Sequence, residues 1–148
     1  MVQISFVAGA GDFDFNGRFR GAACLDRAHD ARMMFFAMHG FSVEKFRQHK
    51  LSPLVLKEKL DYQRDIEPLD EYKLSLSLAG LSVDGTRFML RCELVRSDGK
   101  VAARITSTCG WLDAAVQKLT NPPLPLMAAL KALPMSADYQ VLLSAIKQ

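Results

Sequence analysis

The sequence lacks the features that would tie a chain to nucleic acid, a membrane or an oxidising compartment. The formal net charge is only +3 over 148 residues, with the basic residues spread along the chain, so no nucleic-acid partner is expected. The first residues lack the basic start and long apolar run of a signal peptide, and no stretch is apolar for long enough to span a bilayer. We therefore expect a cytoplasmic protein without membrane attachment.

Cysteine and histidine are also scarce, and neither is spaced for a metal. Three cysteines leave one unpaired in any disulfide scheme, so we expect reduced thiols that fill the core. The histidines lie ten residues apart, unlike metal ligands. A serine nucleophile elbow and the glycine loops that bind phosphates or dinucleotides are missing as well. The residues concerned are Cys24, Cys92, Cys109, His29, His39 and His49. We expect no metal site.

The first third of the chain has a helical pattern between turns. A short strand ends in glycines, and apolar residues then recur at helical spacing until the stop signal at Gly40. Ser42 is placed to begin a second, short helix as its N-cap. The predicted elements are a strand over 2–9, a turn-rich loop over 12–21, a long helix from about 22 to 39 and a short helix over 42–49.

After Pro53 the hydrophobic period changes from helical to alternating. Leu54, Leu56, Leu60 and Tyr62 are expected on one face of the first strand. Two later strands are joined by an Asp-Gly pair, a strong hairpin pattern, so the three long strands form an antiparallel meander. The predicted strands cover 54–62, 71–83, 86–96 and 100–113, and two terminal helices are expected over 124–133 and 136–148.

These elements predict one α+β domain over residues 1–148. The long helix must cover the apolar face of the sheet, since no other early element can do so. From about residue 124 onward we expect a helical extension at the C-terminus.

A candidate site lies where the loop meets the long helix. Asp14 precedes a glycine-containing loop with Gly17, and Gly21 lies near the helix start. The first amides of a helix lack partners and polarise carbonyl oxygens, while a carboxylate opposite them can act as nucleophile or general base. Together these are two ingredients of acyl transfer. The alternative is that Asp12 and Asp14 only form turns, which is the commoner role of aspartate before glycine.

Other polar and aromatic residues are open to two interpretations each. Glu58 falls on the apolar face of its strand and is expected to be paired or to lie near a cavity, which makes it the second-choice acid. The basic cluster could bind an anionic ligand or form a solvated rim, and the phenylalanines could line an acyl pocket or fill the core. The two sets are Arg18, Arg20, Arg27 and Arg32, and Phe13, Phe15, Phe19, Phe35 and Phe36.

The order of these motifs resembles the hot-dog-fold acyl-CoA thioesterases, in the branch of the 4-hydroxybenzoyl-CoA thioesterase. The residues that carry the resemblance are "DFDFNG" followed by "RFRGAACLDRAHDAR", with Asp14, Gly17 and Ala31–Arg32 at the family's spacing. "LDYQRDIEPLDEY" and the later meander continue it. The resemblance covers roughly residues 1 to 130.

The resemblance implies a long helix wrapped by a curved antiparallel sheet and the hydrolysis of a thioester. Asp14 takes the catalytic position, as nucleophile or as base for water, and the amide at Gly21 polarises the carbonyl. Taking the residues and the resemblance together, we expect Gly17, Arg18, Ala22 and Glu58 to contact the substrate. The remaining implications are an acyl-CoA or acyl carrier protein substrate, no cofactor beyond the coenzyme A of that substrate, and a homodimer or homotetramer with its sites between subunits.

Two other functions remain open at the level of sequence. Arg18, Gly21 and Cys24 depart from the side chains common in the family, which favours a non-catalytic protein that binds acyl groups or coenzyme A. A hydratase of the same fold is the third hypothesis, although no histidine is suitably spaced after Asp14.

Overall fold

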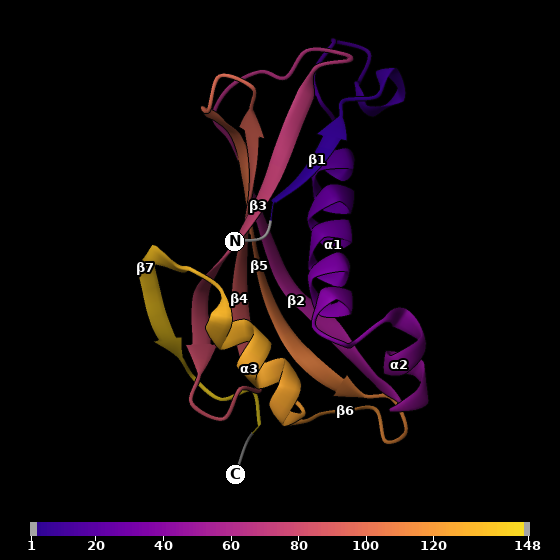
Figure 1. Ribbon diagram of the computed structural model, residues 1–148, viewed down its shortest axis with the longest axis vertical. Helices are drawn as coiled ribbons and strands as arrows, with labels where there is room; N and C mark the ends of the chain where they lie inside the picture. The colour runs from indigo at the N-terminus through magenta and orange to yellow at the C-terminus, as the bar shows by residue number, and fades with distance from the viewer. Residues whose placement is uncertain (1–2, 147–148) are drawn as a thin grey trace.

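The protein, described here over residues 3–146 by a computed structural model, consists of a long helix lying along a curved sheet (Figure 1). The strand order is β1-β3-β4-β5-β2 with antiparallel neighbours. The strands are β1 Gln3–Val7, β2 Leu51–Tyr62, β3 Glu71–Ser82, β4 Arg87–Arg96, β5 Val101–Asp113, β6 Lys118–Leu119 and β7 Met135–Leu142. The helices are η1 Ala10–Asp12, α1 Gly21–Met38, α2 Val43–Gln48 and α3 Leu124–Ala132. This is the α+β arrangement expected from the sequence.

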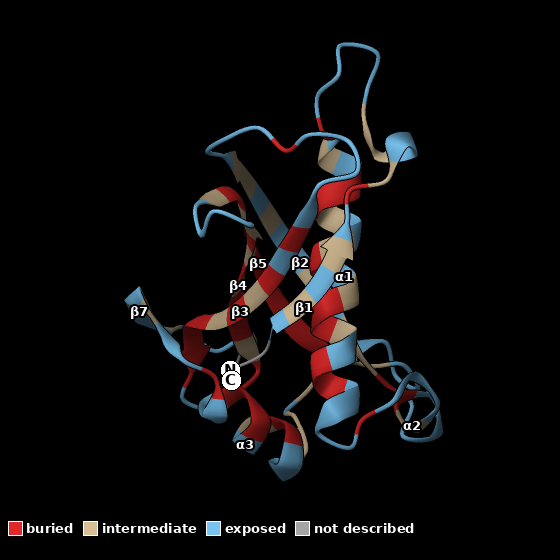
Figure 2. Ribbon diagram, turned by 45° about the horizontal axis from the view of Figure 1, so that its top comes forward, coloured by how far each residue is buried: buried red, intermediate tan, exposed pale blue. Residues whose placement is uncertain are grey.

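Helix α1 buries one stripe against β2, β3 and β5, as Figure 2 shows by the buried residues along its sheet-facing side. Phe35 and Phe36 of this stripe are almost fully buried, and Phe36 meets Trp111 of β5 with ring centroids 5.4 Å apart. The helix therefore covers the apolar face of the sheet as predicted. Burial of large aromatic side chains is the main source of the stability of such a layer.

The local signals at the helix and hairpin ends are confirmed. The hydroxyl of Ser42 accepts a hydrogen bond from the amide of Lys45 at 3.2 Å, so Ser42 is the N-cap of α2. Gly99 has a φ of 82° in the turn between β4 and β5, the left-handed conformation that the Asp-Gly pair predicts. All three cysteines are free and buried.

A β-bulge in β2 overturns the expected face of the first long strand. The pairing with β5 shifts between Val55 and Lys57, so Leu56 is an extra residue. The extra residue reverses which side chains of β2 face the core before and after it. Leu54 and Leu56 are therefore 36% and 42% exposed instead of sharing a buried face with Leu60. Periodicity alone could not show this insertion, because a bulge is defined by the partner strand.

The second terminal helix, predicted over 136–148, is also wrong, since residues 135–142 form strand β7; residues 147–148 of that prediction lie outside the described chain. This strand pairs in parallel with β3 through Gly80, Leu81 and Ser82. The side chain of Leu142 packs so closely on Gly80 that a Cβ there would lie 2.9 Å from Leu142 Cγ. Among the described residues, strand β1 pairs with β3 as far as Ser75, and β7 pairs with the same edge further along, from Leu78 to Ser82. Edge pairing overrides the local helical pattern, whereas the preceding helix α3 forms as expected.

The two edges of the sheet differ as a result. Both β1 and β7 cover the outer edge of β3, while β2 at the opposite end of the sheet pairs only with β5 in the described part of the chain. The unpaired edge of β2 runs beside α1, and its backbone groups are available to another strand.

Candidate active site

The loop before α1 is a tight hairpin rather than an open turn. Phe13 and Phe19 form an isolated β-bridge, and the amide of Asp14 donates to the carbonyl of Arg18 at 2.8 Å. The amide of Gly17 donates to the carbonyl of Asp14 at 3.0 Å, and Gly17 has a φ of 79°. A residue with a Cβ would be strained at this position. The hairpin therefore explains the glycine at residue 17.

The carboxylate of Asp14 is exposed and bound within this hairpin. Its Oδ1 accepts hydrogen bonds from the amides of Asn16 at 2.9 Å and Arg18 at 2.8 Å. The turn-forming role that the sequence left open is thus observed. No hydrogen bond among the described residues joins Asp14 to Gly21 or Ala22, and Oδ2 has no partner within residues 3–146.

Helix α1 begins without a side-chain cap. Arg20 is the N-cap residue, and its carbonyl accepts from the amide of Cys24 at 3.1 Å. The preceding amides, those of Gly21, Ala22 and Ala23, have no acceptor within the part of the chain that the structure describes. The partial positive charge of the helix is therefore uncompensated at this end.

Tyr62, at the end of β2, holds the helix start in place and was not predicted as a site residue. Its hydroxyl donates to the carbonyl of Phe19 at 2.8 Å. A Cβ on Gly21 would lie 3.4 Å from the Leu60 Cδ2 and 3.6 Å from the Tyr62 hydroxyl oxygen. The guanidinium of Arg18 lies over the Tyr62 ring, 5.7 Å from its centroid. The alternating sequence pattern predicted that Leu60 and Tyr62 share one face of their strand. It could not show that this face packs against the start of α1.

The thiol of Cys24 belongs to the same region but is not suited to nucleophilic attack. Burial raises its pKa to about 11, although a hydrogen bond with Tyr62 acts in the opposite direction. Burial likewise raises the pKa of Tyr62 to about 12. Both groups are therefore protonated at neutral pH, and the ionised nucleophile that a thiol would need is not formed.

The first acid of the pair, Asp12, has a structural role. Its Oδ2 accepts from the amide of Gly9 at 3.3 Å and lies 3.9 Å from the Arg27 guanidinium. Its carbonyl accepts from the amide of Arg20 at 2.7 Å. Asp12 therefore ties the end of β1 and the loop to the start of α1.

The predicted arginine cluster is dispersed by the fold. Arg18 and Arg20 are exposed at the loop, Arg27 lies on the β1 side of α1, and Arg32 is only 3% exposed. The interpretation that all four arginines form one solvated rim is therefore wrong for Arg32.

Glu58 is half-buried and paired, as its place on the apolar face required. Its Oε2 accepts a hydrogen bond of 2.8 Å from the hydroxyl of Ser107 on β5. Glu58 precedes Tyr62 by four residues along β2, so the structure does not bring Glu58 to the helix start.

The phenylalanines divide between core and surface. Phe19, Phe35 and Phe36 are buried, and Phe13 is half-buried. Phe15, at the tip of the hairpin, is fully exposed. Core packing is thus the role of three of them, and Phe15 alone projects from the candidate site into solvent.

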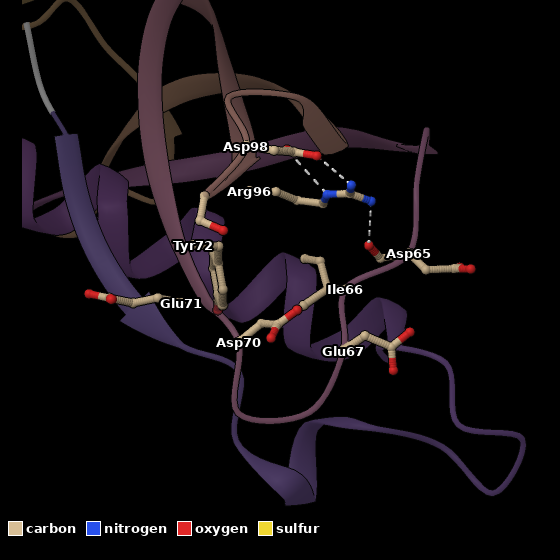
Figure 3. Close-up of a pocket in the computed structure, with 9 residues that line it drawn as sticks. Asp65, Ile66, Glu67, Asp70, Glu71, Tyr72, Arg96 and Asp98 are labelled. Carbon is tan, nitrogen blue, oxygen red and sulfur yellow. Dashed lines mark hydrogen bonds and ion pairs between the residues drawn. The ribbon is translucent and has the colours of Figure 1, made fainter.

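Cavities near the site are small in the single chain. The one lined by Arg18, Tyr62 and Ala103 has a volume of about 10 Å³, room for one water at most. A larger cavity of about 390 Å³ lies at the connection before β3, where Arg96 contacts Asp98 and the carbonyl of Asp65 (Figure 3). It includes none of the predicted site residues. Among residues 3–146 no group of three or more potential ligands is arranged for a metal ion.

The fold is a hot-dog fold, and comparison with known families identifies the class to which the chain belongs. A family model described as the thioesterase-like superfamily matches residues 8–133. The chain therefore belongs to this superfamily. No curated protein matches it in sequence.

Solved structures confirm the hot-dog fold. The hypothetical protein SAV2348 from Staphylococcus aureus, in complex with CoA, is 16% identical with a TM-score of 0.80, over 91% of this chain and 87% of that one. BH1999 gentisyl-coenzyme A thioesterase is 17% identical with a TM-score of 0.77, over 87% and 99%. A 1,4-dihydroxy-2-naphthoyl-CoA thioesterase from Synechocystis is 15% identical with a TM-score of 0.77, over 88% and 96%. None of the helices over residues 3–146 has the length and hydrophobicity of a membrane span.

Proposed function

We propose that this protein is an acyl-CoA thioesterase that binds the thioester carbonyl at the start of α1. The observation that carries the proposal is the uncapped helix start that follows the Asp14 hairpin, where the amides of Gly21 and Ala22 have no acceptor among residues 3–146. Such amides stabilise the oxyanion that forms when a thioester is attacked. The superfamily match and the relatives named for CoA thioesters support the same chemistry. A thioester of an acyl carrier protein would fit the same site.

In the proposed reaction the free oxygen of Asp14, Oδ2, acts on the thioester. The amides of Asn16 and Arg18 orient the carboxylate through Oδ1. Asp14 either attacks the carbonyl carbon, forming a mixed anhydride and releasing the thiolate, or takes a proton from an attacking water. Water hydrolyses the anhydride in the first route, so both routes yield the free acid and the thiol. No cofactor other than the substrate's own coenzyme A is required.

A second subunit would complete the site by pairing along β2. This strand is twelve residues long and has an unpaired outer edge in the described chain. Leu54, Leu56 and Tyr62 on this strand are 36%, 42% and 41% exposed. Exposure of such large apolar side chains to water is unfavourable, and a partner strand would bury them. A homodimer is the minimum assembly in this proposal, and a homotetramer is compatible with it.

The test is release of free thiol from a panel of acyl-CoAs by wild type and Asp14→Asn. Asparagine keeps an oxygen that can accept from the amides of Asn16 and Arg18, so the hairpin is retained and only the charge is lost. We expect a fall in kcat of about 10² or more with an unchanged melting temperature. Asp26→Asn on the exposed face of α1 is the matched control. Equal rates for wild type and Asp14→Asn would remove Asp14 from the mechanism.

The second candidate is a protein that binds acyl groups or coenzyme A without turnover. The observation that favours it is the double hydrogen bond that commits Oδ1 of Asp14 to its own hairpin. Tight binding of acyl-CoA by calorimetry, with no thiol released over a long incubation, would select this candidate over the thioesterase.

A further inference from the structure

An apolar cavity opens at the corner where α1, α2 and the first residues of β2 meet. Its volume is about 380 Å³, which is within the range of pockets that hold small ligands. Its surface is almost entirely apolar, and Val43, which lines it, is 51% exposed. The other large apolar side chains that line it are those of Met33, Phe46, Leu51 and Pro53. Burial of this surface by a ligand would be favourable.

The charged side chains of this cavity are both basic. Arg47 and Lys50 line it together with the apolar residues. Lys50 takes part in none of the ion pairs among residues 3–146, and Arg47 lies 3.9 Å from Glu44, an exposed carboxylate. The local charge therefore suits an anionic ligand with an apolar part and opposes a cationic one. A CoA thioester has this composition, since it joins an acyl group to a phosphorylated carrier.

Within one chain this cavity is remote from the proposed thioester site. Figure 1 shows α2 at the opposite end of α1 from the loop that precedes that helix. Met33 is about 18 Å from Gly21 along α1, and Leu51 is about 36 Å from Tyr62 along β2. Both separations are longer than an eight-carbon acyl chain, so such a chain cannot reach from the helix start to the cavity of the same subunit.

Pairing of two subunits along β2 removes this separation. A two-fold dimer uses the same edge of β2 on both subunits, which makes the two strands antiparallel and keeps both α1 helices on one face of the joined sheet. The beginning of one β2 then lies beside the end of the other. Leu51 and Pro53 at the cavity therefore approach Leu60 and Tyr62 of the second copy, and these two residues contact its helix start.

We propose that the cavity of one subunit receives the apolar acyl group of a thioester whose carbonyl is bound at the helix start of the other subunit. This inference rests on the proposed thioester site and on the dimer along β2. The apolar wall selects a plain alkyl chain over one that carries a hydroxyl group, because a hydroxyl buried there loses its hydrogen bonds to water.

The test is subunit complementation between Asp14→Asn and Val43→Asp, assayed by thiol release from octanoyl-CoA. Val43 is the first residue of α2, where an aspartate favours the helix, so Val43→Asp adds a charge at the cavity and keeps the fold. Each variant alone should lose activity, by about tenfold or more for Val43→Asp. Mixed dimers of the two variants, purified through a different tag on each subunit, should recover about half of wild-type activity, because one of their two sites is intact.

The reciprocal mixed dimer is the control for this complementation. It combines wild type with a subunit that carries both Asp14→Asn and Val43→Asp, so each site has one defect and activity should be low. Val116→Asp, at another exposed apolar position, should leave activity unchanged. If the reciprocal dimer keeps half of the activity while the first mixed dimer is inactive, the cavity serves its own subunit and the proposal is overturned.

The choice of acyl group is tested with octanoyl-CoA and 8-hydroxyoctanoyl-CoA. We expect wild type to prefer the plain chain by about tenfold in kcat/KM, and Val43→Asp to reduce this preference. Absence of thiol release from every thioester would count against the thioesterase. The cavity would then be judged by calorimetry, in which Val43→Asp should weaken octanoyl-CoA binding and Val116→Asp should not. Equal use of both chains, binding that Val43→Asp leaves unchanged, or an active wild-type monomer would overturn the proposal.

Discussion

The hydroxyl of Tyr62 donates a hydrogen bond of 2.8 Å to the carbonyl of Phe19, across 43 residues of sequence. This contact links the last residue of β2 to the residue that precedes the N-cap of α1. The unpartnered amides at the helix start are thereby set against the open edge of the sheet. The position of the proposed oxyanion site depends on this contact between strand and helix.

Tyr62→Phe should therefore impair catalysis more than folding. The ring is retained, but the Phe19 carbonyl loses its donor and the helix start is less well positioned. We expect kcat for acyl-CoA hydrolysis to fall about tenfold, with a loss of stability on the order of 1 kcal/mol. Steady-state kinetics and thermal denaturation measure the two effects. A large loss of stability without a change in kcat would mean that the contact only supports the fold.

Phe15 should contribute to substrate binding and not to the stability of the chain. It is fully exposed at the tip of the Asp14 hairpin, so Phe15→Ser removes no core contact. We expect KM for acyl-CoAs to rise severalfold while the melting temperature stays within the error of the measurement. Val116→Ser, at another exposed apolar position, is the control. An unchanged KM would mean that Phe15 does not contact the substrate.

Leu56→Lys should break the proposed assembly along β2. Leu56 is the bulged residue of this edge strand and is 42% exposed, with its Cδ1 3.6 Å from where a Cβ on Gly110 of β5 would lie, and a charge there opposes burial against a second subunit. We expect light scattering to show dimers for wild type and monomers for this variant, with thioesterase activity lost together with the dimer. Val83→Lys, in the turn after β3, should remain dimeric. Wild-type monomers that hydrolyse acyl-CoA would exclude this assembly as a requirement.

Asp84 should make stability depend on acid pH. Burial alone would raise its pKa, but hydrogen bonds from Ser144, Thr86 and Ser82 hold the pKa of this carboxyl well below its usual range. Because the folded-state pKa is depressed, the stabilisation is complete above the unfolded pKa of about 3.9 and is lost as pH falls below it. Asp84→Asn should lower the melting temperature at pH 7, and the difference from wild type should narrow below pH 4. A constant difference at all pH values would contradict this.

Gly85→Ala should destabilise the turn between β3 and β4. Gly85 has a φ of 74°, and a Cβ there would lie 2.6 Å from the Met127 sulfur and 2.9 Å from Pro122 Cγ. Strain and overpacking together should cost on the order of 2–4 kcal/mol in the free energy of unfolding. Gly99→Ala, at a similar φ with open space around it, should cost about 1–2 kcal/mol from the backbone alone. Denaturant unfolding of both variants separates packing from strain.

The sequence was a good guide where the determining contacts are local. The Ser42 cap, the Asp98–Gly99 hairpin and the long helix were all predicted, because capping, turn conformation and helical periodicity act over a few residues. The bulge at Leu56 and the strand at 135–142 were not, because each depends on a partner strand. The family resemblance added the overall fold and directed attention to Asp14.

For the site, the sequence identified the residues of one loop but not their partners. The sequence left open whether Asp14 is a turn residue or a catalytic acid. It could not show that the amides of Asn16 and Arg18 both donate to Asp14 Oδ1. It treated Arg32 as one of a group of arginines, although the fold buries this one alone beneath α1.

By itself the sequence determined which segments become helices and strands over most of the chain, and that a glycine-containing loop leads into a helix. Those outcomes follow from short-range stereochemistry and hydrophobic period. Only the tertiary structure decided which sheet edge stays open, which side chain meets the helix start and which charge is buried. Such relationships join residues far apart in the chain, and they exist only when the whole sheet has closed around α1.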